Sequence, residues 1–493
     1  MPHKKLYIVL GAIVCIFLAA FLPLLVMPSV KGGVDVSDSS VVYSVLQTAR
    51  THFDNPFQRA LAFRYQIIHH EVVDQKDWYR AVGKTLFGVS IHTADVFSDG
   101  STFTFPSFEN DIVTPGNEIL NQVQDDNPDV ELTAADRAGM TLSAGRCEGT
   151  DKPKLTHLPM DMEDFSMIIP YGMTAGGHVT PIDHQYFSPA DYNSPLDAYE
   201  VYAMADSRIV AIGPRPRIDK DGNPFEEYRM IFSMSCRLLY YYDLVTSLAP
   251  DLKAAYERDG NNINFPVKAG QLIGYIGGQT LDFAVWDTEK PLTGYVVPEH
   301  YESEGWKIYT ADPLDYYADE LKEQALSKYI RTAEPRSGRI DHDIDGKLIG
   351  NWFQQNTDGT TSGYSDTGGE YWTTHVSFSP DHIDPTGFII SIGNWPGGAT
   401  QFSAKGNTPD PATVGVETGL VKYDLRGVNY RDSNGNWDRM SLKPPITFEP
   451  GIEAYGCALV QLTDSRELKV EVFKGSNCSS VFGFTDAAVM YMR

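Results

Sequence analysis

The sequence predicts a mainly β protein with a few helices, divided into several domains. After about residue 155, short apolar runs rich in Val, Ile, Tyr and Phe alternate with turn residues, a pattern typical of strands. The 42 glycines, 30 prolines and 12% aromatic residues favour turns and strands over a helical bundle. A length of 493 residues exceeds one ordinary domain, since a domain averages about 150 residues.

The chain is strongly acidic. It carries 40 Lys and Arg against 65 Asp and Glu, a formal net charge of −25. Such a surface repels phosphate backbones, so we expect no nucleic-acid partner. Hydrophobic residues make up 42% and charged residues 21% of the chain, a composition that excludes global disorder.

Residues 1–30 are expected to form a transmembrane signal anchor. Lys4 and Lys5 precede an uncharged apolar run from Leu6 to Met27, which is long enough to cross a bilayer. The lysines favour a cytoplasmic N-terminus and an extracytoplasmic remainder, so the predicted localisation is a single-pass membrane protein. A cleaved signal peptide is the alternative, but its apolar region is shorter and ends in a small-residue cleavage site.

Four of the five cysteines lie beyond the apolar run: Cys147, Cys236, Cys457 and Cys478. An even number in an oxidising compartment allows two disulfides. Cys457 and Cys478 flank a predicted hairpin and are the favoured pair, which leaves Cys147 for Cys236. Four buried free thiols are the alternative.

Residues 31–150 are expected to form a linker and a mixed region. The segments 41–53 and 55–73 fit either helices or a pair of strands. Residues 107–150 are polar with few apolar runs and are predicted to be loops.

Two β-domains are predicted to follow, over 151–315 and 341–493. In the first, Lys220-Asp221-Gly222-Asn223 is a tight-turn signal between two strands. Asp312-Pro313 then predicts the start of a connector helix that continues through 316–340. The last segment contains eight short apolar runs separated by Gly, Asn and Asp, which predict a small antiparallel barrel.

Two phrases in the first β-domain carry a family resemblance. They are Val201-Tyr202-Ala203 followed by ADSRIV at 205–210, and KAGQLIGY at 268–275. With the segment GMTAGGHVTPIDHQYF at 172–187, their order resembles the LytM/lysostaphin-like zinc metalloendopeptidases, which are peptidoglycan hydrolases. The resemblance covers about 155–315 and implies an antiparallel β-barrel or sandwich.

The resemblance also implies a zinc site. In that family a His and an Asp with three residues between them, together with the second His of a His-x-His strand, hold zinc. The matching residues here are His178, Asp183 and Asp282, but the first spacing is one residue longer and the third ligand is a carboxylate. Carboxylates do bind zinc, so zinc remains the expected cofactor if the site is intact. The longer spacing also allows His184 to face the site in place of Asp183.

The resemblance further implies that the catalytic apparatus is degenerate. Thr280 and Asp243 stand where the family has two further histidines. Neither side chain titrates near neutral pH in its ordinary state. We therefore predict a non-catalytic protein that binds cell-wall peptide or glycan, or an envelope partner protein. The alternative is a divergent zinc endopeptidase of the cell wall in which Asp243 or His184 assists the catalytic water.

Two weaker motifs precede or open the last domain. Asp341, Asp343 and Asp345 resemble the start of a calcium loop and predict a weak calcium site, although loop position twelve is Trp352 rather than Glu. The triplet at 350–352, Gly-Asn-Trp, resembles the motif of lipocalin-type barrels. A lipocalin-like barrel could carry a small apolar ligand, which is a further alternative function.

Overall fold

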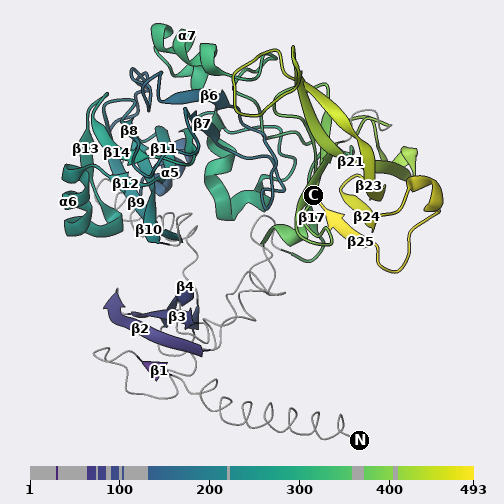
Figure 1. Ribbon diagram of the computed structural model, residues 1–493, viewed down its shortest axis with the longest axis horizontal. Coiled ribbons are helices and arrows are strands. Elements are labelled where there is room, and N and C mark those ends of the chain that lie inside the picture. The colour runs from purple at the N-terminus through teal and green to yellow at the C-terminus, as the bar shows by residue number, and fades with distance from the viewer. Residues whose placement is uncertain are drawn as a thin grey trace, which may run out of the picture. The chain divides into compact units, whose positions relative to one another are not determined.

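The computed structural model describes residues 132–218, 223–357, 371–403 and 409–493, together with the backbone of five strands between residues 29 and 104 (Figure 1). The chain divides into two compact units, Met1–Asp111 and Ile112–Arg493. The predicted membrane anchor at 1–30 lies outside the described residues apart from one strand of two residues at 29–30. No helix within the described ranges is long and apolar enough to span a bilayer.

The first unit contains one five-stranded sheet in the order β1–β2–β3–β4–β5. Its strands are β1 (Ser29–Val30), β2 (Arg64–Val73), β3 (Lys76–Lys84), β4 (Ser90–Ser98) and β5 (Phe103–Thr104). β1 pairs in parallel with β2, and the other pairs are antiparallel. Of the two structures that the segment 55–73 allowed, its last ten residues therefore adopt the strand, while 41–53 lies outside the described residues.

The second unit begins with an antiparallel sheet in the order β13–β9–β10–β11–β15–β7–β6, with β16 beside β15. The bounds are β6 (Phe165–Ile169), β7 (Gln185–Pro189), β9 (Ser207–Ile218), β10 (Pro224–Ser233), β11 (Leu238–Val245), β13 (Phe265–Val267), β15 (Leu281–Asp287) and β16 (Thr310–Ala311). A three-stranded sheet contains β12 (Ser247–Leu248), β14 (Leu272–Ile276) and β8 (Tyr199–Tyr202). The predicted hairpin around 220–223 joins β9 to β10, where Ile218 pairs with Pro224.

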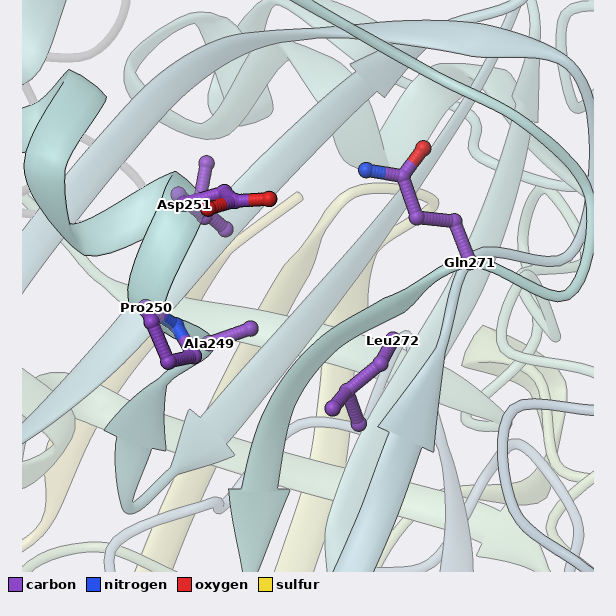
Figure 2. Close-up of a pocket in the computed structure, with 6 residues that line it drawn as sticks. Ala249, Pro250, Asp251, Gln271 and Leu272 are labelled. Atoms are coloured by element: carbon purple, nitrogen blue, oxygen red, sulfur yellow. The ribbon is translucent and has the colours of Figure 1, made fainter.

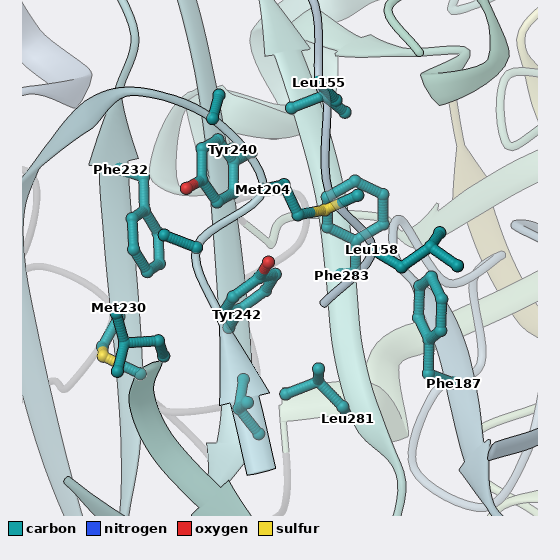
Figure 3. Packing of buried hydrophobic residues seen from close by; sticks show 14 of the residues in the cluster. Leu155, Leu158, Phe187, Met204, Met230, Phe232, Tyr240, Tyr242, Leu281 and Phe283 are labelled. Carbon is teal, nitrogen blue, oxygen red and sulfur yellow. The ribbon is translucent and has the colours of Figure 1, made fainter. Parts of the chain in front are cut away.

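Strand alternation separates the core from the candidate site. On β11, Tyr240 and Tyr242 enter the main core, where Tyr240 stacks on Phe232 with ring centroids 4.4 Å apart (Figure 3). Tyr241 and Asp243 therefore face the other side of the sheet, because successive side chains of a strand point to opposite faces. The same alternation on β15 buries Phe283 in the main core and turns Asp282 to the side of Asp243.

The helices differ from the expectations. The prediction of loops over 107–150 is wrong at α5 (Ala134–Leu142), which Thr133 and Asp136 cap reciprocally. The helix is only nine residues long, and it holds too few apolar residues to show the periodicity of an amphipathic helix in the sequence. A further helix, α6 (Pro250–Asp259), begins with proline in its first turn.

The connector is shorter than predicted. Asp312 accepts a hydrogen bond from the Leu314 amide at 2.9 Å, but this caps only a 3₁₀ turn, η3 (Pro313–Asp315). The helix proper, α7 (Asp319–Lys328), starts after extended backbone at Ala318. The sequence therefore predicted the capping residue Asp312 correctly, but the helix that it caps is much shorter than predicted.

The predicted second barrel is confirmed as a closed antiparallel barrel of eight strands. Its strands follow one another around the barrel in chain order, and the pairing of β20 with β21 completes the circle. They are β17 (Gly350–Gln354), β18 (His375–Pro380), β19 (Phe388–Ile392), β20 (Thr400–Ser403), β21 (Val421–Asp432), β23 (Thr447–Asp464), β24 (Glu467–Lys474) and β25 (Val489–Met492), with the short β22 (Gly435–Asn436) beside β21.

Both predicted disulfides are confirmed, Cys147–Cys236 and Cys457–Cys478. The first joins the segment after α5 to the turn between β10 and β11. Arg237 strengthens the same junction, since its Nε donates to Asp136 at 2.8 Å. The alternative of four free thiols is therefore wrong for this structure.

Candidate functional site

Three neighbouring strands place polar side chains in one row. Asp282 on β15 pairs with Asp243 on β11 and with Tyr186 on β7. Directly opposed residues on adjacent strands lie close together on one face of a sheet. Two carboxylates in such a row repel each other unless positive charge is supplied nearby.

His184 supplies part of that charge. It precedes Tyr186 by two residues, so its ring faces the same side of the sheet. Its Nε2 lies 3.2 Å from Asp282 Oδ2 and 3.1 Å from the Tyr186 hydroxyl, and its Nδ1 lies 3.1 Å from Asp183 Oδ1. The other oxygen of Asp183 accepts a hydrogen bond from Trp306 Nε1 at 2.7 Å.

Two arginines supply the remaining positive charge near the two carboxylates. Arg229 Nε donates to Asp243 Oδ2 at 2.8 Å, and Arg215 Nη2 forms an ion pair with the other oxygen. The Leu244 amide also donates to Asp243, at 2.7 Å. Burial alone would raise the pKa of Asp243, but the positive charges of Arg229 and Arg215 outweigh it and lower that pKa. Asp243 therefore remains ionised at neutral pH and is a poor proton acceptor there.

The ionisation of the other groups follows from burial and charge. Burial would lower the pKa of His184, but the charges of Asp282 and Asp183 outweigh it and raise that pKa. Asp183 has a lowered pKa because Lys307 and His184 offset its burial. Asp282 has a raised pKa, chiefly through burial and also through the charge of Asp243. The His184 ring thus stands between two carboxyl groups whose negative charge favours its protonated form.

His178 lies at the tip of the loop that precedes β7. Its ring centroid is 6.0 Å from that of His184, and unlike His184 it is exposed. Although exposed, it is surrounded closely enough by protein atoms to lose part of its hydration, and His184 and Lys307 add positive charge nearby. These effects lower the pKa of His178 to about 4, so its imidazole is neutral.

The predicted zinc ligands, His178, Asp183 and Asp282, do not fit one ion. Asp183 contacts Nδ1 of His184 and Asp282 contacts Nε2, so the two carboxylates lie at opposite edges of one imidazole ring. Two ligand atoms of one zinc ion can be at most ~4 Å apart, twice the Zn–O distance of ~2.0–2.2 Å. Within the described ranges, no three His, Cys, Asp or Glu side chains are placed to hold a metal ion.

Thr280, which stands where the family has a histidine, belongs to the same cluster. Its hydroxyl donates to Asp282 Oδ1 at 3.3 Å. It orients the carboxylate, and it supplies no group that could exchange a proton with a substrate.

The three carboxylates of the predicted calcium loop each have separate partners. Asp341 pairs with Arg339 at 2.6 Å, Asp343 accepts from the Asn351 amide at 2.9 Å, and Asp345 pairs with Arg466 at 3.1 Å. These contacts divide the carboxylates among three local hydrogen-bond sets.

The predicted lipocalin-like motif places Trp352 of β17 in the buried cluster of the barrel. Trp352 Nε1 donates to the Leu348 carbonyl at 2.8 Å, and the Arg493 guanidinium lies 4.0 Å from the centre of its ring. The barrel interior holds a continuous cluster of packed side chains, whose large members are Trp352, Phe378, Trp395, Phe402, Tyr423 and Tyr491. An eight-stranded barrel has room either for such a filling or for one small ligand, so this packing favours a structural barrel over a carrier.

Two surface pockets of about 280 Å³ lie away from the cluster. Figure 2 shows one between the start of α6 and the start of β14, where Asp251 and Gln271 face each other across the opening. The second lies beside Tyr171 and Arg339. Neither is lined by His184, Asp243 or Asp282.

Sequence reasoning missed Arg215, Arg229 and Trp306. The arginines come from the β9–β10 hairpin and the tryptophan from the 3₁₀ segment η2 (Pro298–Tyr309). Nothing in their local sequence links them to the residues near 180. Only the antiparallel register of β10 with β11 brings Arg229 beside Asp243.

Comparison with known proteins adds little. No protein-family model matches the chain, and no curated protein matches it. A solved structure of a zinc-containing peptidase from Vibrio cholerae aligns with 13% identity and a TM-score of 0.21, over 52% of this chain and 63% of that one. The alignment spans less than two thirds of the length of that peptidase, and similarity at this level carries no argument about fold or activity.

Proposed function

We propose that the chain is a membrane-anchored extracytoplasmic protein whose first β-domain binds cell-wall peptide or glycan, or an envelope partner protein, without hydrolysing it. One observation carries the proposal. The His184 ring stands between Asp183 and Asp282, and the charges of these two carboxyl groups raise its pKa and favour its positively charged form. A protonated side chain therefore provides the positive charge that the resemblance assigns to a metal ion.

The state of Asp243 supports the same proposal. Hydrolysis of an amide requires a group that can take a proton from water near neutral pH. Arg215 and Arg229 lower the pKa of Asp243 and hold it ionised, and the raised pKa of His184 favours its protonated form. His178, the other predicted site histidine, is neutral, and its ring is exposed.

The two disulfides support an extracytoplasmic location for the second unit. Disulfides form and persist in oxidising compartments and are rare where thiols are kept reduced. The bonds Cys147–Cys236 and Cys457–Cys478 fit the topology in which the apolar segment from Leu6 to Met27 anchors an exported chain. That anchor rests on the sequence alone.

A divergent zinc endopeptidase is the rival function, and one contact favours it. Asp183 contacts Nδ1 of His184, so a metal ion that displaced the Tyr186 hydroxyl from Nε2 could bind that nitrogen together with Asp282 and His178. A carboxylate behind a metal-binding histidine is a common arrangement in zinc sites. The nearby positive charges of Lys307 and Arg229, both of which lower the pKa of His178, oppose an added cation.

Zinc content and wall hydrolysis distinguish the two functions. We expect the purified full-length chain, equilibrated with excess zinc and desalted, to retain far less than one zinc ion per chain. It should sediment with purified wall material and release no peptide from it, because Asp183 and Asp282 lie at opposite edges of the His184 ring and Asp243 is held ionised.

The His178→Ala variant is the matched control, since it removes the one exposed predicted ligand. The proposal expects wild type and variant to give the same low zinc content. Retention of about one zinc ion per chain, lost in His178→Ala and accompanied by peptide release, would establish the endopeptidase instead. Absence of sedimentation with wall material would overturn the binding function.

A further inference from the structure

The buried cluster is closed to ligands in this structure. Only 8% of the surface of His184, 5% of Asp282 and 2% of Asp243 is exposed. Side chains covered to this degree present almost no area to a peptide or a glycan. The proposed function, on which this inference rests, therefore needs a movement that uncovers them.

The segment between Gly172 and Ile182 carries His178, whose ring centroid lies 6.0 Å from that of His184. Its base is closed by hydrogen bonds from the Gly172 amide to the Ile182 carbonyl and from the Ile182 amide to the Met173 carbonyl, each 2.9 Å long. Its tip is a tight turn in which Ala175 and His178 exchange backbone hydrogen bonds. We name residues 172–182 the covering loop.

Glycines give the covering loop its points of bending. Gly172 and Gly176 have φ values of +92° and +53°, in the region that other residues adopt only with strain. The tip is exposed at Ala175, Gly176 and His178, whereas Val179 and Ile182 are buried at its base. A rigid base with an exposed glycine tip is typical of a segment that moves about its ends.

The C-terminal barrel fastens this tip. Gln401 on β20 accepts a hydrogen bond from the Gly176 amide at 2.9 Å and donates one to the Gly176 carbonyl at 3.0 Å. Trp372 packs on the adjacent Gly177 so closely that a Cβ there would lie 2.8 Å from its ring. Two residues of the barrel thus hold the two glycines next to His178.

Separate contacts hold the barrel itself. Asn351 donates to the Tyr301 hydroxyl at 2.7 Å, and Arg331 donates to the His382 carbonyl at 2.9 Å. A buried apolar cluster also joins Met167 and Ile330 to Ile389 and Phe448 of the barrel. The contacts of Gln401 can therefore break while the barrel stays in place.

We propose that Gln401 and Trp372 form a latch that holds the covering loop over the His184 cluster, and that the proposed binding site opens when this latch releases. The C-terminal barrel then regulates access to a site in the other β-domain. Gln401 is a positioning residue, because it acts on the cluster only through the loop.

Amide hydrogen exchange of the full-length chain tests the latch without any ligand. Gln401→Ala removes both hydrogen bonds to Gly176, so amides in residues 175–182 should exchange about tenfold faster than in wild type. Gln401→Glu keeps the acceptor and loses the donor, and should give a smaller increase. Thr400→Ala is the matched control, since Thr400 lies on the same strand and bonds only the Gly398 carbonyl at 2.9 Å; its loop should exchange as in wild type.

Unchanged exchange of the loop in Gln401→Ala would overturn the latch, as would a general increase that includes β18 and β19, because Gln401 would then be a structural residue of the barrel. The same variants also separate the latch from the proposed function. If the loop responds as expected and neither wild type nor Gln401→Ala sediments with wall material, the binding function fails and the latch stands. If the latch regulates that function, Gln401→Ala should associate with wall material faster than wild type.

Discussion

Replacing Arg215 and Arg229 together with methionine should destabilise the second unit by about 3–5 kcal/mol at neutral pH. Both arginines pair with Asp243, of which 2% is exposed. Methionine keeps much of the side-chain length and removes both positive charges, which leaves the buried carboxylate of Asp243 without its two arginine partners. Breaking a buried ion pair in this way typically costs about 3–5 kcal/mol. Denaturant unfolding followed by tryptophan fluorescence would measure the loss.

The pH dependence of that loss has a definite sign. The pKa of Asp243 is lowered in the folded chain, so its pairing stabilises the fold above the unfolded pKa of about 3.9 and stops doing so as pH falls through the lowered value. The difference between wild type and the double variant should therefore shrink below about pH 4.

Two further variants identify the cause of the loss. Adding Asp243→Asn to the double variant should restore part of the stability, because the uncompensated charge is gone. Arg217→Met, on the same strand as Arg215, should cost less than the double variant, since half of the Arg217 side chain is exposed and its partner Glu227 keeps its ion pair with Arg215. A double variant as stable as Arg217→Met would show that Asp243 does not depend on the arginines.

Removing the Cys147–Cys236 disulfide should have an effect of similar size. The bond joins residues 89 positions apart, and the chain-entropy estimate for such a loop is about 4–5 kcal/mol. The Cys147→Ser/Cys236→Ser variant should unfold at a clearly lower denaturant concentration than wild type, measured without reductant.

The second disulfide provides the matched comparison. Cys457 and Cys478 are 21 positions apart, for which the same estimate gives about 3 kcal/mol. Cys457→Ser/Cys478→Ser should therefore lose less stability. An equal or smaller loss for the long loop would show that α5 and its contacts with Arg237 already restrain the segment around Cys147 without the bond.

Strand pattern was the part of the fold that the sequence could predict. Each apolar run of the last domain becomes one strand of the barrel, from Gly350–Gln354 to Val489–Met492. Such runs are local, and their turn residues mark their ends. The cysteine count likewise predicted both disulfides, because four cysteines in an oxidising compartment leave few pairings.

The sequence could predict which residues form the site but not how they are arranged. The sequence identified Asp243, Asp282, His184 and Asp183, and the structure does bring these four together. It could not supply their arrangement, since the face on which His184 points depends on the register of β7 against β15. The neutralising arginines arrive through pairing of β9, β10 and β11, which local sequence does not encode.

We propose that a protonated His184, rather than a metal ion, neutralises the carboxyl groups on either side of it. Nitrogen-15 NMR of histidine-labelled full-length chain tests this most directly, with His184→Gln used to assign the signals. We expect both ring nitrogens of His184 to carry protons at about pH 7, with chemical shifts unchanged by one equivalent of zinc. Loss of the Nε2 proton, with a stoichiometric zinc-induced shift of that nitrogen, would contradict it.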